Sequence, residues 1–164
     1  MNIIELHSTL WDRLQARRAQ LPHSLLLSGP RGLGKFDLAR AFAASLLCES
    51  PLKNGNACGS CPACNWLSQG NHPDFRLLQP DALAESEGEE GTETKESGKK
   101  ASQQITIDQV RGLDDFLDVG THRHGLRVVI VCPAEAMNRS TANALLKTLE
   151  EPAAGTLFLL VSNE

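Results

Sequence analysis

Two clusters of residues in this chain have types and spacing that suit chemistry. The first is a glycine-rich segment made of Gly29, Pro30, Arg31, Gly32, Leu33, Gly34, Lys35 and Phe36. It fits the phosphate-binding pattern G-x-x-x-x-G-K-[ST] except at its last position. In that pattern backbone N–H groups surround phosphates, the Lys contacts them and the Ser/Thr hydroxyl ligates Mg²⁺. Because Phe36 has no oxygen, the segment predicts a phosphate loop without its magnesium ligand. The simpler alternative is a glycine-rich turn that only begins a helix.

An enzyme that hydrolyses a nucleotide in such a loop also needs acids at the end of a second apolar strand. There an Asp orders Mg²⁺ and a following Glu positions the attacking water. The apolar residues 128–131 are followed instead by Cys132 and Pro133. Glu135 lies two residues beyond the Glu position and would serve only if the turn were rearranged. Cys132 is most simply interpreted as a small, buried residue at a strand end. The magnesium hydroxyl ligand and the acids that order magnesium and water are therefore both absent. Because both absences affect the same metal ion, the sequence predicts that this chain does not hydrolyse a nucleotide.

The second cluster contains four cysteines, namely Cys48, Cys58, Cys61 and Cys64. Four thiolates make a closed tetrahedral site, which is typical of structural rather than catalytic zinc. We therefore expect one zinc ion per chain, held by residues 48–64. Free thiols in a loop and an iron–sulfur cluster are the alternatives, although the latter favours a further Cys followed by Pro, and Asn65 follows Cys64 here. His72 is expected to lie in a loop rather than to replace a cysteine.

Composition limits the classes of function. The chain has 164 residues, 41% of them hydrophobic, which suits one well-packed domain. Five cysteines without the pattern of an export signal predict a reducing compartment, with the cytoplasm as the default, and no long apolar run predicts a membrane span. The net charge of −4 arises within residues 81–100, and the remainder is balanced. A zinc-dependent DNA-binding module is therefore disfavoured.

The order of predicted elements indicates an α/β fold. Strands are expected at 24–28, 75–78, 126–132 and 156–161, and helices at 6–20, 36–47, 62–69, 108–119 and 141–150. Continuous apolar strands that alternate with helices predict a parallel sheet with helices on both faces. Residues 81–104 are rich in Glu, Ser, Gly and Lys, and predict a disordered acidic loop. The chain stops just after its last predicted strand, which favours a piece of a longer protein.

Two helices carry detailed expectations. In the first helix Leu6, Leu10, Trp11 and Leu14 are predicted to share one side. In the last helix Ser140 is the expected N-cap residue. Its predicted core face comprises Ala142, Leu145, Leu146 and Leu149. Asn143, Lys147 and Glu151 lie at i, i+4 spacing on the other face, which is either an ordinary solvated surface or a contact with another protein.

Three features together resemble clamp-loader subunits of bacterial DNA polymerase III, which are AAA+ proteins. They are the cysteine cluster placed after the phosphate-loop helix, the sequence His72-Pro73-Asp74, and residues 140–152 with the sequence Ser-Thr-Ala-Asn-Ala-Leu-Leu-Lys-Thr-Leu-Glu-Glu-Pro. The resemblance covers the whole chain except the acidic loop. Phe36, Cys132 and Pro133 depart from the motor subunits of this family and are similar to its members with a degenerate nucleotide site.

The resemblance implies an AAA+ nucleotide-binding-type domain over residues 1–164, with C-terminal helical domains absent from this chain. It implies a non-hydrolysing scaffold subunit in a hetero-pentamer whose motor subunits use ATP to place a sliding clamp on primed DNA. An active ATPase subunit is the alternative. Ser162 and Asn163 fall at the position that senses the γ-phosphate, and Asn143, Lys147 and Glu151 would contact a neighbouring subunit. An arginine offered to a neighbouring site is expected beyond Glu164.

Overall fold

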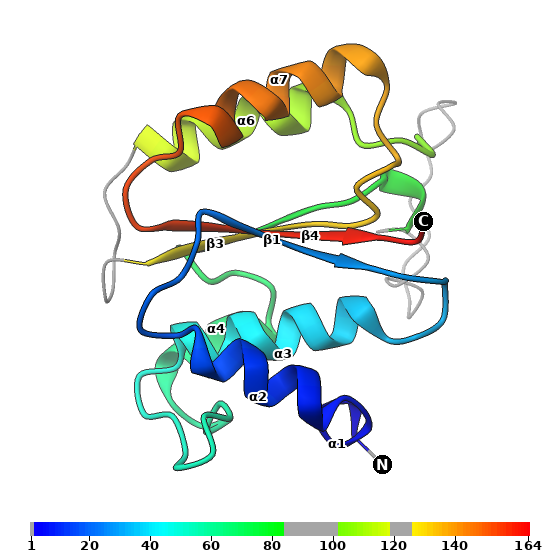
Figure 1. Cartoon of the computed structure of the whole chain (residues 1–164). Helices are drawn as coiled ribbons and strands as arrows, with labels where there is room; N and C mark the ends of the chain where they lie inside the picture. Colours follow the sequence, from blue (N-terminus) through cyan, green and yellow to red (C-terminus); the bar gives the residue numbers. More distant parts are fainter. Residues whose placement is uncertain (1, 84–101, 119–125) are drawn as a thin grey trace, which may run out of the picture.

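A computed structural model describes residues 2–83, 102–118 and 126–164, and places four parallel strands in one sheet. The strands are β1 (Ser24–Ser28), β2 (Phe75–Leu78), β3 (Arg127–Val131) and β4 (Thr156–Ser162). Their order across the sheet is β1-β4-β3-β2. Figure 1 shows helices on both faces of this sheet. The predicted α/β architecture is confirmed.

One face of the sheet is covered by α1 (Ile3–Leu6), α2 (Ser8–Ala16), α3 (Lys35–Leu47) and α4 (Pro62–Ser68). Helix α3 lies at the centre of this layer, and Phe42 on it is fully buried. The ring of Trp11 meets Phe42 edge to face, with centroids 6.2 Å apart. The sheet residues of this core are Leu27, Val128, Ile130, Leu157, Leu159 and Val161. Alternate strand residues thus face α3, as a pleated strand requires.

The expected helix at 6–20 is instead two shorter helices. Helix α1 begins with a capping box between Asn2 and Glu5, and His7 then leaves helical geometry with φ −115° and ψ 38°. Trp11 and Leu14 are buried as predicted and Leu10 is partly buried, but Leu6 is 59% exposed. The prediction for Leu6 was wrong because the break at His7 takes α1 out of the helical phase of α2.

The other face is covered by α6 (Ile107–Asp118) and α7 (Arg139–Glu150). Their core contains Val110, Leu113, Phe116 and Leu145, packed against Leu78, Val129, Val131 and Phe158 of the sheet. At the end of α6 the buried Arg127 donates to the carbonyl oxygens of Phe116 and Leu117, at 3.1 and 2.6 Å. Those carbonyls have no partner within their own helix, so Arg127 satisfies the C-terminus of α6.

Helix α7 begins earlier than predicted and is rotated relative to the predicted phase. Asn138, not Ser140, is its N-cap residue, and its side chain accepts from the N–H of Thr141 at 2.8 Å. Thr141 and Leu145 are buried, whereas Leu146 is 51% exposed. Ser140 is already inside the first turn, so it cannot cap the helix. The prediction that Leu146 lies in the core was wrong, because the sheet packs against the neighbouring stripe of the helix.

The described residues on either side of positions 84–101 are hydrogen-bonded to each other. The N–H of Ala82 donates to the carbonyl oxygen of Ser102 at 3.0 Å, and Gln109 Nε2 donates to Gln79 and Asp81. The expected disordered loop falls mostly on residues 84–101, which lie outside the described residues, as does position 119 at the end of the predicted helix 108–119. Among the residues that the structure describes, no helix has the length and apolar character to cross a membrane.

Candidate metal centre and phosphate loop

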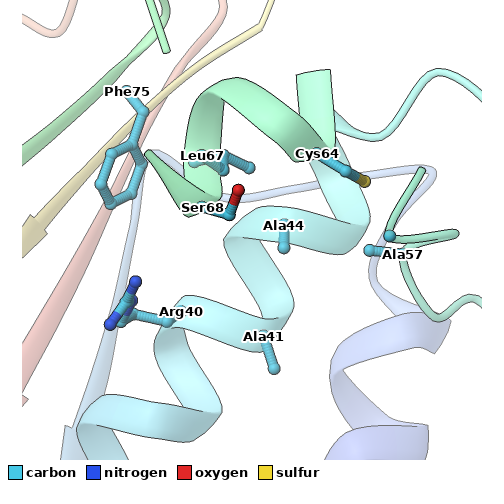
Figure 2. A pocket seen from close by; sticks show the side chains of 9 residues that line it. Arg40, Ala41, Ala44, Ala57, Cys64, Leu67, Ser68 and Phe75 are labelled. Atoms are coloured by element: carbon cyan, nitrogen blue, oxygen red, sulfur yellow. The ribbon is translucent and has the colours of Figure 1, made fainter. Parts of the chain in front are cut away.

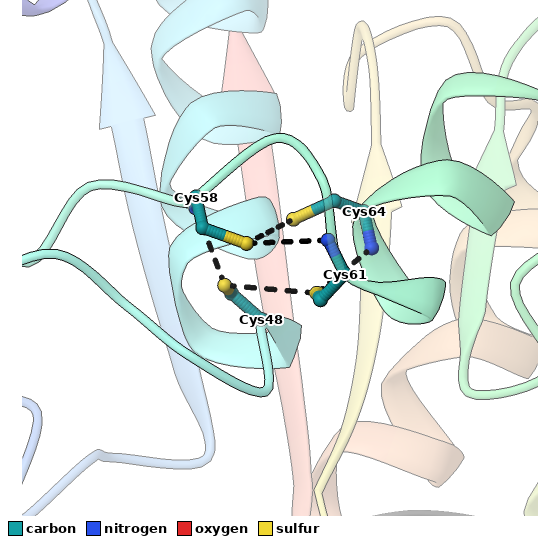
Figure 3. Close-up of side chains that lie close together, drawn as sticks. All are labelled: Cys48, Cys58, Cys61 and Cys64. Carbon is teal, nitrogen blue, oxygen red and sulfur yellow. Dashed lines mark hydrogen bonds between the residues drawn. The ribbon is translucent and has the colours of Figure 1, made fainter.

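The four cysteines of the predicted metal site converge (Figure 3). All four sulfur atoms lie within 4.8 Å of one another, with Cys48 and Cys61 at 3.9 Å and Cys58 and Cys64 at 4.0 Å. A tetrahedron with bonds of about 2.3 Å to a central zinc has edges of about 3.8 Å. The four thiols therefore fit one tetrahedral ion. His72 is outside this cluster, and its Nδ1 accepts from the N–H of Asp74.

Local backbone structure fixes the four sulfurs and supplies hydrogen bonds to them. Cys48 follows the last residue of α3, and Cys61 is the N-cap residue of α4. The sulfurs of Cys48, Cys58 and Cys61 accept from backbone N–H groups at 3.3 to 3.5 Å. Such N–H donors stabilise thiolates, the form in which cysteine binds a metal.

Two of the thiols differ in ionisation. Hydrogen bonds from the N–H groups of Ser60 and Cys61 lower the pKa of Cys58 to about 6. Burial raises the pKa of Cys64 to about 12. Metal binding requires deprotonated thiols, so an ion would have to displace the proton of Cys64.

The cysteine module, residues 48–64, is attached to the domain on two sides. Arg18 donates to the carbonyl oxygens of Ser45, at 2.7 Å, and Gly55, at 3.5 Å. Helix α4 packs on α3 through the fully buried Ala63. A pocket of about 280 Å³ lies between these two helices and next to Cys64, and Arg40, Leu67 and Phe75 are among its lining residues (Figure 2).

The glycine-rich segment forms a strand-to-helix turn between β1 and α3. Gly34 is the N-cap residue of α3 and has φ 77°, a left-handed conformation that favours glycine. Lys35 is nine-tenths buried, and its Nζ donates to the carbonyl oxygens of Gly29 and Pro30 at 2.6 and 2.7 Å. Lys35 therefore closes the loop on itself. Phe36 is partly buried against the core, where the pattern would place a hydroxyl.

The N-terminal helices cover one part of this loop. His7 Nε2 lies 2.6 Å from the carbonyl oxygen of Leu33. The side chain of Ile3 contacts Gly34 so closely that a Cβ at this position would collide with it. Sequence reasoning found no link between these segments, because hydrophobic periodicity within one helix carries no information about its partner in another part of the chain.

Cys132 and Pro133 directly follow β3, and neither side chain has an oxygen atom that could bind a metal ion. Cys132 packs against the core but is only partly buried, so its interpretation as a small buried residue holds in part. Glu135, which the sequence analysis set aside, lies beside the end of β4, where its Oε1 accepts from the N–H of Asn163 at 2.9 Å. The turn after β3 thus places the Glu135 carboxylate beside the end of β4.

Several groups keep Glu135 ionised. Burial acts to raise its pKa, but backbone N–H groups of Glu135 and Asn163 act in the opposite direction. The Ser162 hydroxyl and the positive charge of Lys35 also lower it, and the pKa lies below its usual range. The predicted sensor residues, Ser162 and Asn163, therefore contact Glu135. Ser162 pairs in register with Ser28, immediately before the loop.

The three residues predicted for a subunit contact lie on one groove. Asn143, Lys147 and Glu151 are exposed, and all three line a groove of about 570 Å³ between α6 and α7. Arg111, Asp114 and Asp118 of α6 line its other side. Both signs of charge are present, so the groove suits a polar protein surface better than a uniformly charged ligand such as DNA.

Comparison with known proteins decides the family. Residues 7–164 match the family model described as DNA polymerase III, delta subunit. The chain belongs to this family. A delta-subunit family relative, DNA polymerase III subunit delta' of Pseudomonas aeruginosa, is 42% identical over 163 residues, covering 99% of this chain and 44% of that protein. Subunit delta' of Escherichia coli is 34% identical over 142 residues, covering 87% and 37% respectively.

More distant members extend the comparison. DNA polymerase III subunit tau of Salmonella typhimurium is 30% identical over 145 residues, covering 88% of this chain and 19% of tau. A crystal structure of a DNA polymerase III gamma subunit-related protein from Thermotoga maritima superposes with a TM-score of 0.57 at 20% identity, over 94% of this chain and 38% of that one. This likeness concerns the fold. The chain spans less than half the length of the relatives it matches.

Proposed function

We propose that this chain acts as a non-hydrolysing scaffold in the clamp loader of DNA polymerase III. It would support the ATP-dependent loading of a sliding clamp onto primed DNA, in the cytoplasm, as one member of a hetero-pentamer. The observation that supports this proposal most directly is the set of side chains in the phosphate loop and at the end of β3. Lys35 keeps the loop closed, while Phe36, Cys132 and Pro133 supply no oxygen to Mg²⁺ or to an attacking water.

The cysteine module would hold one structural zinc ion per chain. Its four sulfurs fit a tetrahedral ion and are all protein ligands, which leaves no position for a reacting water. Between Cys48 and Ala63 no residue is buried, so the module has no apolar core of its own. The ion would therefore fix the shape of this module and would take no part in chemistry.

The outer face of α7 would contact a neighbouring subunit. Asn143, Lys147 and Glu151 line the groove with α6, and Leu146 on the same helix is 51% exposed. An exposed Leu beside a charged residue, here Lys147, suits an interface that also buries apolar area. Leu146→Asp and Lys147→Glu in the full-length protein should each weaken association with the other subunits. Lys53→Glu, the same charge change at an exposed position of the cysteine module, should leave association unchanged.

Turnover tests the absence of hydrolysis. Full-length, metal-loaded protein should release phosphate from Mg·ATP no faster than its own Lys35→Met variant, because both would lack the magnesium ligands. Turnover in the wild type that Lys35→Met abolishes would contradict the scaffold proposal.

An active ATPase subunit remains as the second candidate, and one observation favours it. Glu135 places a carboxylate at the end of β4, close enough to be influenced by the charge of Lys35. A carboxylate at that edge could order a metal ion in place of the missing acid.

A further inference from the structure

The pocket between α3 and α4 has no part in the function proposed above. It lies on the face of the sheet opposite α6 and α7, and so away from the proposed subunit contact. Its lining comes from α3, α4, the first residue of β2 and the cysteine module, which supplies Ala57, Gly59 and Cys64 (Figure 2). The module therefore forms one wall of this pocket.

The size and lining of the pocket suit an apolar side chain. Apart from Arg40, Ser68 and Gly59, the residues that line it have apolar side chains. Leu67 and Phe75 are only partly buried against the core, so both leave apolar surface open to the pocket. Pockets that enclose a drug-sized ligand have about 300–1,000 Å³. A volume of about 280 Å³ therefore suits one large apolar side chain better than a whole cofactor.

Arg40 adds a positive charge to this apolar pocket, and it alone is charged among the described residues of the lining. Its guanidinium lies over the ring of Phe36, one turn earlier on α3, at 5.7 Å from the centroid. Within the parts of the chain that the structure describes, no carboxylate and no hydrogen-bond acceptor pairs with this guanidinium. Its planar set of N–H donors matches the two oxygens of a carboxylate. The pocket thus combines an apolar interior with an unpaired cation.

We propose that this pocket binds a segment of another protein that carries a large apolar side chain next to a carboxylate. The apolar side chain enters between Ala44, Leu67 and Phe75, and the carboxylate pairs with Arg40. One large side chain in a pocket is the usual anchor of a protein–protein contact, and the charge pair selects which segments fit. The assignment goes beyond the scaffold role, because it places a second partner on the other face of the sheet.

Three synthetic peptides test both parts of the proposal. The first is the acetylated hexapeptide amide Gly-Ser-Phe-Glu-Ser-Gly, and the other two replace its Glu by Gln or its Phe by Ala. Their binding to the full-length, metal-loaded protein is measured by nuclear magnetic resonance titration. We expect the first peptide to bind, the Gln peptide to bind about fivefold more weakly, and the Ala peptide not to bind detectably.

Variants of the protein complete a double-mutant cycle. Arg40→Gln should weaken binding of the Glu peptide about fivefold and leave binding of the Gln peptide unchanged, because both changes remove the same charge pair. Ala44→Leu should abolish binding, since the larger side chain fills the pocket. Arg13→Gln, at an exposed position of α2 outside the lining, is the matched control and should bind as the wild type does.

Three results would overturn the proposal. They are undetectable binding of the Glu peptide at millimolar concentration, equal binding of that peptide by the wild type and Arg40→Gln, and binding of the Ala peptide as tight as that of the Phe peptide. A dimer of the wild type that Ala44→Leu abolishes would assign the pocket to a second copy of the chain instead. Thermal unfolding midpoints within a few degrees of the wild type verify folding, and the Arg40→Gln cycle decides alone if Ala44→Leu does not fold.

Discussion

The cysteine module and the phosphate loop lie at opposite ends of the same helix, and only the module has kept every side chain that its chemistry requires. Gly34 precedes α3 and Cys48 follows it. The glycine-rich loop has Phe36 where its motif has a Ser/Thr, and Cys132 and Pro133 stand where the motif has two acids, yet the turn is closed. The module retains all four thiols within 4.8 Å of one another. The two ends of α3 therefore differ in how many of their motif residues are present.

The difference lies in what holds each region in shape. The loop depends on contacts within the folded chain, namely the Lys35 hydrogen bonds, the left-handed Gly34 and the packing of Ile3. None of these contacts requires a bound nucleotide. The module has no buried residue between Cys48 and Ala63, so the proposed metal ion would hold its shape. The loop can therefore keep its shape without a bound nucleotide, whereas the module should not keep its shape without its thiol ligands.

The largest expected effect is on the module. Cys58→Ser removes one ligand from a half-buried position, so little packing is lost and the change reports on the metal. The metal content should fall from about one ion per chain to well below half, and stability should fall by about 3 kcal/mol. Elemental analysis and urea denaturation measure both. Cys132→Ser, at the half-buried cysteine outside the module, is the control and should retain the metal. A Cys58→Ser protein with full stability would break the comparison, because the module would then hold its shape without its ligands.

Lys35→Met should have the next largest effect. It preserves the length of a nine-tenths buried side chain but removes both hydrogen bonds to the loop carbonyls, at a cost of about 2 kcal/mol. Zinc content should not change, since the loop and the module are separate. Lys147→Met, at an exposed position of α7, should be nearly neutral in the same denaturation experiment. Equal stability of the two variants would mean that the loop does not depend on Lys35.

The smallest effect compares two glycines with the same backbone geometry. Gly34 in the loop has φ 77° and Gly59 in the module has φ 76°. Alanine at either position therefore meets similar backbone strain, but only at Gly34 would its Cβ collide with Ile3. Gly34→Ala should be more destabilising than Gly59→Ala by about 1 kcal/mol. Ile3→Ala should recover part of that difference. Equal losses would show that the N-terminal helix does not stabilise the loop.

The sequence predicted those features that depend on local pattern. β1 and β2 match their predicted ranges, because each is a short, largely apolar segment bounded by turn residues. The four metal-site cysteines were found because four thiols at this spacing have few other uses. The exposed position of Leu146 could not be predicted, since two neighbouring stripes of α7 are nearly equally apolar and only the sheet decides between them.

The position of Glu135 beside β4 could not be predicted for a different reason. Its distance from the apolar strand excluded it from the motif, and a motif assumes that the following turn has its usual path. Here the turn after β3 is held against β4 by the hydrogen bond of Ala134. Glu135 could have been found by considering every carboxylate within a few residues after β3, whatever its exact distance from the strand.

One hydrogen bond bears on how the length of this chain can change. Ala82 and Ser102 are joined at 3.0 Å, so the residues between them begin and end at the same point of the fold. The entropy of closing a loop grows only with the logarithm of its length, and each doubling costs about 0.6 kcal/mol. Insertions and deletions between these two residues should therefore accumulate among relatives with little effect on stability.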